Sequence, residues 1–109
     1  MLNTMDAPNL LKIKEISGGM TDFEQEMLQI IKEELPEEIE QYHSNLEAKD
    51  FLKTAGDVHK LKHKISILNM KHGYETAVTY ENELRAGRPT SAQDFEAVLN
   101  KMVVFVNQL

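Results

Sequence analysis

The chain has 109 residues, which is enough for one compact domain and too few for two. It contains no cysteine, which excludes disulfides, thiolate zinc sites and cysteine nucleophiles. Its formal net charge of −6 argues against nucleic acid as the main partner, because a phosphate backbone requires a basic protein surface.

No apolar stretch of the sequence is long enough to span a bilayer, and the run at 102–106 is far too short. The N-terminal sequence MLNTMDAPNL lacks the basic start and the apolar run of a signal peptide. We therefore expect a cytoplasmic protein that does not bind membranes. From its length, we expect one domain over residues 1–109.

Helical periodicity begins at Asn9–Ile16, which predicts a short helix closed by the turn Ser17-Gly18-Gly19. A long amphipathic helix then begins at Thr21, with Glu24 at the spacing of a capping box. Pro36 either bends this helix or starts a second one. The apolar residues expected to form its buried stripe are Phe23, Met27, Ile30, Ile31, Leu35, Ile39, Tyr42 and Leu46.

Three further helices are predicted in the second half of the chain. Asp50 is a candidate N-cap for a third helix that ends near Asn69, a residue that tolerates left-handed backbone. A fourth helix runs from about Tyr74 to Arg85, and Thr90 or Ser91 caps the last one. The third helix has an inward stripe of Phe51, Ala55, Val58, Leu61, Ile65 and Leu68. No segment alternates with period two, so we predict an all-α fold: an antiparallel four-helix bundle with a short additional N-terminal helix.

Charge is distributed unevenly along the chain. Acidic residues crowd 33–40, and lysines crowd the third predicted helix and its end at positions 53, 60, 62, 64 and 71. Two solvated helix faces account for this pattern, and we expect the acidic run to be such a face. The alternative is that the basic segment surrounds a site that handles anions.

His59 stands out among the four histidines by its position on the third helix. Gly56 lies one turn before it, and Lys62, His63 and Ser66 follow within two turns, all outside the inward stripe. We expect an exposed imidazole, which is largely neutral near pH 7 and can accept a phosphoryl group brought in line with it. Lys62 would then offset phosphoryl charge as a flexible point charge. From the residues alone, an ordinary surface histidine is the alternative.

Residues 57–84, DVHKLKHKISILNMKHGYETAVTYENEL, resemble the signature of histidine-containing phosphotransfer (HPt) domains, whose active helix reads roughly His-x-Leu-Lys-Gly. The motif appears here as His59-Lys60-Leu61-Lys62-His63. Residues 16–50 resemble the family's first long helix, with its preceding Gly-Gly turn and mid-helix proline. Glu81 and Leu84 to Arg85 fit the pattern of the helix after the active one, so the similarity covers nearly the whole chain.

The resemblance implies a phosphocarrier of two-component phosphorelays whose chemistry is largely supplied by its partner, and not a stand-alone enzyme. In that family a histidine takes a phosphoryl group from a receiver-domain aspartate and passes it to another. The implied partners are response-regulator receiver domains and a hybrid sensor kinase. One bundle can close its own core, so we expect a monomer. The domain itself would bind no cofactor, since the receiver supplies Mg²⁺. The implied roles are phosphoacceptor for His59, electrostatic helper for Lys62 and a phosphoryl-proximal position for Arg85. From their positions around His59 on the same helix, we also expect Gly56, His63 and Ser66 at docking or phosphoryl-proximal positions.

Two positions depart from the family pattern. His63 replaces the usual glycine after the lysine, and Asn69 occupies a later glycine position. A bulky imidazole at His63 could crowd a docked receiver or hydrogen-bond to the phosphoryl group. It could also be phosphorylated in place of His59.

Two other functions compete with the phosphocarrier. His59 and His63 are four residues apart and could bind one metal ion from a single helix face. However, no glutamate completes an HExxH motif, and Glu40 with His43 supplies only one of the two Glu-x-x-His steps of a di-iron bundle, so we predict no metal site. The second competitor is a non-catalytic helical adaptor that binds receiver or kinase domains without phosphotransfer.

Overall fold

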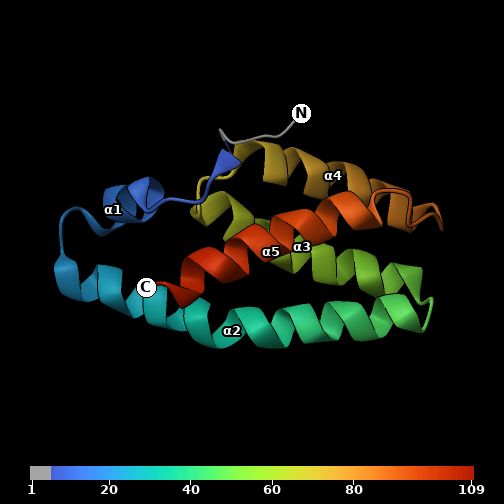
Figure 1. Cartoon of the computed structure of the whole chain (residues 1–109), viewed down its shortest axis with the longest axis horizontal. Coiled ribbons are helices and arrows are strands. Elements are labelled where there is room, and N and C mark those ends of the chain that lie inside the picture. Colours follow the sequence, from blue (N-terminus) through green and yellow to red (C-terminus); the bar gives the residue numbers. More distant parts are fainter. Residues whose placement is uncertain (1–5) are drawn as a thin grey trace.

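The computed structural model describes residues 6–109, and these residues contain five helices and no strand. The helices are α1 (Leu11–Ser17), α2 (Thr21–Glu47), α3 (Phe51–Ile67), α4 (Lys71–Arg85) and α5 (Ala92–Asn107), shown in Figure 1. The predicted all-α class is thereby confirmed. None of the described helices combines the length and the apolar character that crossing a membrane requires.

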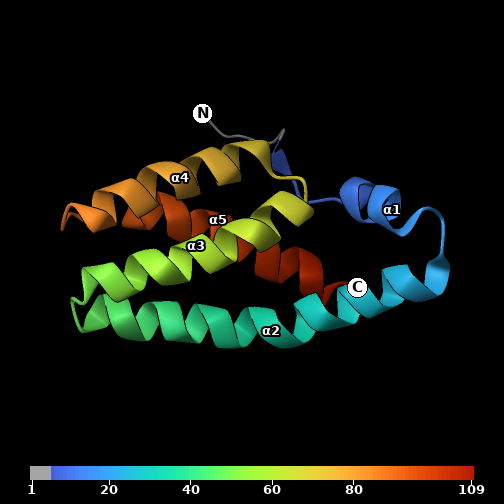
Figure 2. The same cartoon turned by 180° about the vertical axis from the view of Figure 1, so that it is seen from behind.

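Helices α2 to α5 run antiparallel to their neighbours in sequence, and α5 returns against α2 to close the bundle (Figures 1 and 2). The short α1 contacts α2 at one end. Three-residue connections, 48–50 and 68–70, hold α3 between α2 and α4. Helix α3 therefore has two packed sides and leaves one strip of its surface for solvent or a partner.

The core draws apolar side chains from every helix. The α3 stripe is buried as predicted, except that Phe51 is only partly buried. The stripe predicted for α2 is wrong at Phe23 and Ile30, which are exposed. These two residues lie on a neighbouring strip of α2, because the buried set follows the spacing Leu28, Ile31, Leu35 and Tyr42.

Several helix ends follow the sequence signals. Helix α2 continues through Pro36, and Figure 1 shows its N-terminal part inclined to the rest, so the proline bends the helix without breaking it. The Asp50 side chain accepts a hydrogen bond from the backbone N–H of Lys53 at 3.2 Å, which confirms the cap. Asn69 follows α3 with a φ of 62°, as expected.

Two predicted caps are wrong. Thr21 is already the first helical residue of α2, and the preceding Met20 makes no side-chain cap, so there is no capping box. Ser91 directly precedes α5, but its side chain binds Glu83 and not the N–H groups of its own helix.

Helix α4 begins at Lys71, three residues earlier than predicted. The buried Asp6 carboxylate accepts hydrogen bonds from the N–H groups of His72 and Gly73, at 3.0 and 2.8 Å. A capping residue 66 positions earlier in the chain thus satisfies the first turn of α4. Periodicity within α4 cannot reveal such a distant cap.

Candidate functional site

His59 lies on the open strip of α3, and half of its side-chain surface (50%) is exposed. This confirms that its ring faces solvent. Gly56, one turn earlier, is half-buried, and a Cβ atom built there would meet no atom within 4 Å. The missing side chain is therefore not required by packing within the chain, and it leaves room beside His59.

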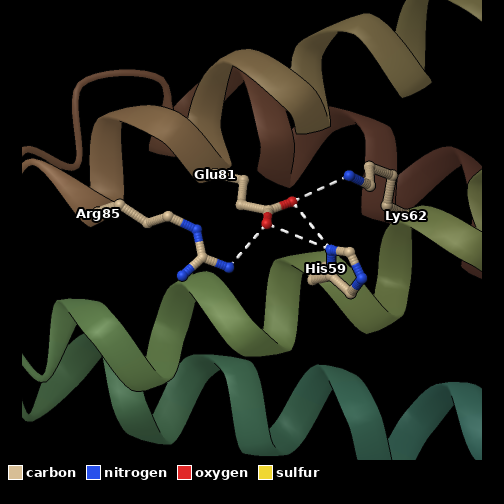
Figure 3. A network of polar contacts seen from close by, with 4 residues as sticks. All are labelled: His59, Lys62, Glu81 and Arg85. Atoms are coloured by element: carbon tan, nitrogen blue, oxygen red, sulfur yellow. Dashed lines mark hydrogen bonds and ion pairs between the residues drawn. The ribbon is translucent and has the colours of Figure 1, made fainter.

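The inner edge of the His59 ring meets a carboxylate from α4 (Figure 3). Its Nδ1 lies 3.2 and 3.4 Å from the two carboxylate oxygens of Glu81. Lys62 Nζ donates to Oε1 of Glu81 at 3.1 Å, and Arg85 Nη2 donates to Oε2 at 2.9 Å. We call these four residues the Glu81 cluster.

Glu81 is buried, with 10% of its side chain exposed. Burial raises the pKa of this carboxyl group, but the hydrogen bonds from Arg85 and Lys62 outweigh burial and bring the pKa below its ordinary value of 4.5. Glu81 is therefore ionised near pH 7. An ionised carboxylate only accepts hydrogen bonds, so it favours the His59 tautomer with its proton on Nδ1. The lone pair of Nε2, which Figure 3 shows on the ring edge away from Glu81, is then free.

Lys62 differs from the flexible point charge that the sequence predicted. Only 15% of its side chain is exposed, and its Nζ also lies 5.8 Å from the centre of the Tyr74 ring. Packing of α3 on α4 places the lysine in the seam between the two helices and fixes its ammonium group against Glu81. Arg85 reaches the same carboxylate from one turn along α4 and remains half exposed.

The other predicted site residues on α3 lie outside the Glu81 cluster. The His63 ring is exposed, with its centre 5.1 Å from that of His59 and an interplanar angle of 66°. Ser66, farther along, accepts a hydrogen bond from Lys12 Nζ of α1 at 3.4 Å. His63 is thus a direct neighbour of His59, whereas Ser66 belongs to the contact between α1 and α3.

Exposed apolar side chains flank the histidine. Leu52 precedes Gly56 by one turn of α3 and is 67% exposed. Tyr74 and Val78 are also exposed and lie on the strip of α4 that contains Glu81 and Arg85. We call this surface the His59 face: Leu52, Gly56, His59, His63, Tyr74 and Val78.

The lysines of α3 do not all surround this face. Lys64 points to the opposite side, where its Nζ donates to Glu34 at 2.8 Å and to Glu38 at 3.0 Å on α2. Burial lowers the pKa of Lys64, but the two glutamates outweigh burial and raise the pKa above its ordinary value of 10.5. The acidic run is therefore not simply a solvated face, and two lysines of the basic segment, Lys62 and Lys64, enter different interfaces.

No site role was predicted for Glu81, the carboxylate that links the other three residues of the cluster. One signal was available, because Glu81 occupies an inward position of α4 among the buried residues Ala77, Tyr80 and Leu84. A glutamate is rarely buried without a charged partner. The spacing offers Arg85, four residues later, as one partner, but it does not identify Lys62 or His59 on α3.

Among residues 6–109, no three or more His, Cys, Asp or Glu side chains are grouped in a way that could hold a metal ion. Comparison with protein families matches residues 26–107 to the model described as Hpt domain. The match includes the whole Glu81 cluster and excludes α1. No curated protein and no solved structure matches the chain.

Proposed function

Since this chain belongs to the Hpt domain family, the histidine phosphocarriers of phosphorelays, we propose that His59 is its phosphoacceptor. His59 takes a phosphoryl group from the aspartyl phosphate of one receiver domain and passes it to an aspartate of another. The observation that carries this proposal is the half-exposed imidazole whose Nδ1 contacts the buried carboxylate of Glu81, at 3.2 Å.

The contact suits nucleophilic attack. The lone pair of Nε2 forms a bond to phosphorus, while the bond from phosphorus to the receiver's aspartate oxygen breaks and releases a carboxylate. The imidazole becomes positively charged in this step. Glu81 accepts the Nδ1–H hydrogen bond and offsets that charge, so one carboxylate both orients the nucleophile and stabilises its product.

Lys62 and Arg85 supply the complementary charge. Two cationic side chains share one carboxylate, which leaves an excess of positive charge beside His59. A phosphoryl group on Nε2 carries negative charge on its oxygens, and nearby cations stabilise it during the transfer. Both side chains are already held in place, so little reorganisation is needed.

We propose that the receiver docks on the His59 face. Gly56 lets its backbone approach, and Leu52 and Val78 provide apolar contact for a small transient interface. The Mg²⁺ needed for aspartate chemistry arrives with the receiver. A hybrid sensor kinase supplies the phosphoryl group upstream, and the carrier acts as a monomer in the cytoplasm.

Transfer from a receiver labelled with radioactive phosphate tests the proposal. The wild type should acquire acid-labile label, and His59→Ala should acquire none while retaining its circular dichroism spectrum and receiver affinity. His43→Ala, which changes an exposed histidine on α2, is the matched control and should be labelled like the wild type.

Two outcomes would contradict the assignment. Label that persists in His59→Ala and disappears in His63→Ala would move the phosphoacceptor to His63. Receiver binding without any label on the wild type would identify a non-catalytic helical adaptor.

A further inference from the structure

We propose that His59 and His63 form a two-imidazole site for a borderline transition-metal ion, Zn²⁺ in the first instance, and that the bound ion blocks phosphoryl transfer. The sequence offered this pair as an alternative but led us to predict no metal site, and two observations from the structure now argue for one. The block on transfer rests on the proposed function, whereas metal binding does not.

The first observation is the spacing of the two rings. His59 and His63 lie four residues apart on the same exposed strip of α3, and their ring centres are 5.1 Å apart. When two imidazoles bind one tetrahedral Zn²⁺ through bonds of about 2.0 Å, geometry puts their ring centres about 5 Å apart. The spacing of the two rings therefore already matches that of a shared ion.

The second observation is the carboxylate behind His59. A histidine that binds a metal usually donates its other ring N–H to a carboxylate or carbonyl, which fixes the ring and strengthens the metal bond. Glu81 occupies that position, 3.2 Å from Nδ1, while Nε2 lies on the opposite ring edge (Figure 3). The arrangement that prepares Nε2 for phosphorus thus also prepares it for a metal.

The surroundings determine which ions bind. Lys62 and Arg85 oppose any cation electrostatically, so binding must come from coordination by imidazole nitrogen. Mg²⁺ and Ca²⁺ require oxygen ligands and should not bind, whereas Zn²⁺ accepts imidazole readily. Both rings are exposed, so water can fill the remaining coordination positions.

Metal and phosphoryl group exclude one another because they use the same electron pair. The lone pair of His59 Nε2 either coordinates the ion or attacks phosphorus. The ion would therefore act as a competitive inhibitor of transfer, while the Mg²⁺ that accompanies the receiver would leave His59 accessible.

Calorimetric titration of the full chain with ZnCl₂ at neutral pH tests the site. We expect one ion per chain, and an affinity lower by at least about tenfold in His63→Ala, which retains one of the two nitrogens. Glu81→Gln should lower the affinity about tenfold through the loss of the supporting carboxylate. His43→Ala should bind like the wild type, and MgCl₂ should give no binding heat.

The metal site is overturned if the wild type binds no Zn²⁺, or if His63→Ala binds it equally well.

The block is tested by the ratio of transfer rates with and without Zn²⁺, with one receiver for all variants so that an effect on the receiver cancels. The ratio should fall well below one for the wild type and remain closer to one for His63→Ala. Equal ratios overturn the block. Zn²⁺ binding to a chain that never acquires label would preserve the metal site and refute the proposed function.

Discussion

Helix α3 contributes to two partly buried charge clusters through lysines only two residues apart. Lys62 enters the seam with α4 and binds Glu81, together with Arg85 and His59. Lys64 enters the seam with α2 and binds two glutamates, which we call the Lys64 cluster: Glu34, Glu38 and Lys64. Both ammonium groups are largely shielded, with 15% and 11% of their side chains exposed.

The two clusters differ in the sign of their excess charge. The Glu81 cluster has one carboxylate for two permanent cations and an imidazole, so it favours an additional anion. The Lys64 cluster has two carboxylates for one ammonium, so it repels an anion. Burial of charge alone therefore does not identify the site. What distinguishes the candidate site is an excess of positive charge beside an exposed nucleophile.

The largest effect should come from Glu81→Gln, which removes the charge of the first cluster at nearly constant shape. We expect transfer to His59 to slow by about a hundredfold, because the amide no longer offsets imidazolium charge and can favour the wrong tautomer. Rapid-quench measurement of label transfer gives the rate, and Glu75→Gln on the exposed side of α4 is the control. Unchanged transfer in Glu81→Gln would show that the carboxylate is only structural.

Lys64→Met should affect stability and not transfer. It leaves Glu38 without its cation, and Oε1 of this carboxylate is buried with no hydrogen-bond partner among the described residues. We expect a loss of about 2 kcal/mol in the free energy of unfolding, less than for a fully buried pair because Glu34 is half exposed. Urea denaturation measures the loss, with Lys60→Met on the surface as the control. If folded Lys64→Met transferred the phosphoryl group more slowly than the wild type, the Lys64 cluster would also contribute to transfer.

The contributions of the two clusters to folding stability should also be lost at opposite ends of the pH scale. The pKa of Glu81 is lowered on folding, so its contribution to stability is present above its ordinary value of 4.5 and is lost as the pH falls through the folded value. The pKa of Lys64 is raised, so its contribution is present below 10.5 and is lost as the pH rises through the folded value. In thermal melts, the melting temperature of Glu81→Gln should approach that of the wild type in acid. The melting temperature of Lys64→Met should approach that of the wild type in alkali. The reverse pattern would contradict both assignments.

The smallest effect on stability should come from Gly56→Ala beside the first cluster. Alanine is favoured over glycine inside a helix, and the added Cβ meets no atom, so the free energy of unfolding should rise by about 0.5–1 kcal/mol. Receiver affinity should fall, because the methyl group occupies the docking surface. Gly73→Ala is the matched control, since its Cβ would meet Val98 at 3.0 Å and should give no such gain. Unchanged receiver affinity in Gly56→Ala would place docking elsewhere.

Local signals in the sequence were sufficient for much of the fold. Periods of three and four residues gave the helices and the buried stripe of α3, and the same spacing placed His59 on the open side. The capping of α2 and α4 was not predictable, because local spacing does not show which group binds the first N–H groups of a helix. Asp6 caps α4 across 66 positions, and Thr21 forms no capping box although its spacing to Glu24 was right.

The sequence by itself determined the helical bundle, the exposed histidine and the resemblance to a family, because each depends on residues within a few turns of one another. Only the tertiary structure decided that Glu81 joins His59 and Lys62 of α3, and that Lys64 turns to the other side. These contacts join helices whose relative angle and register are set by how their side chains interlock. Periodicity along one helix shows which side faces inward, but it does not show which side chain of another helix lies opposite.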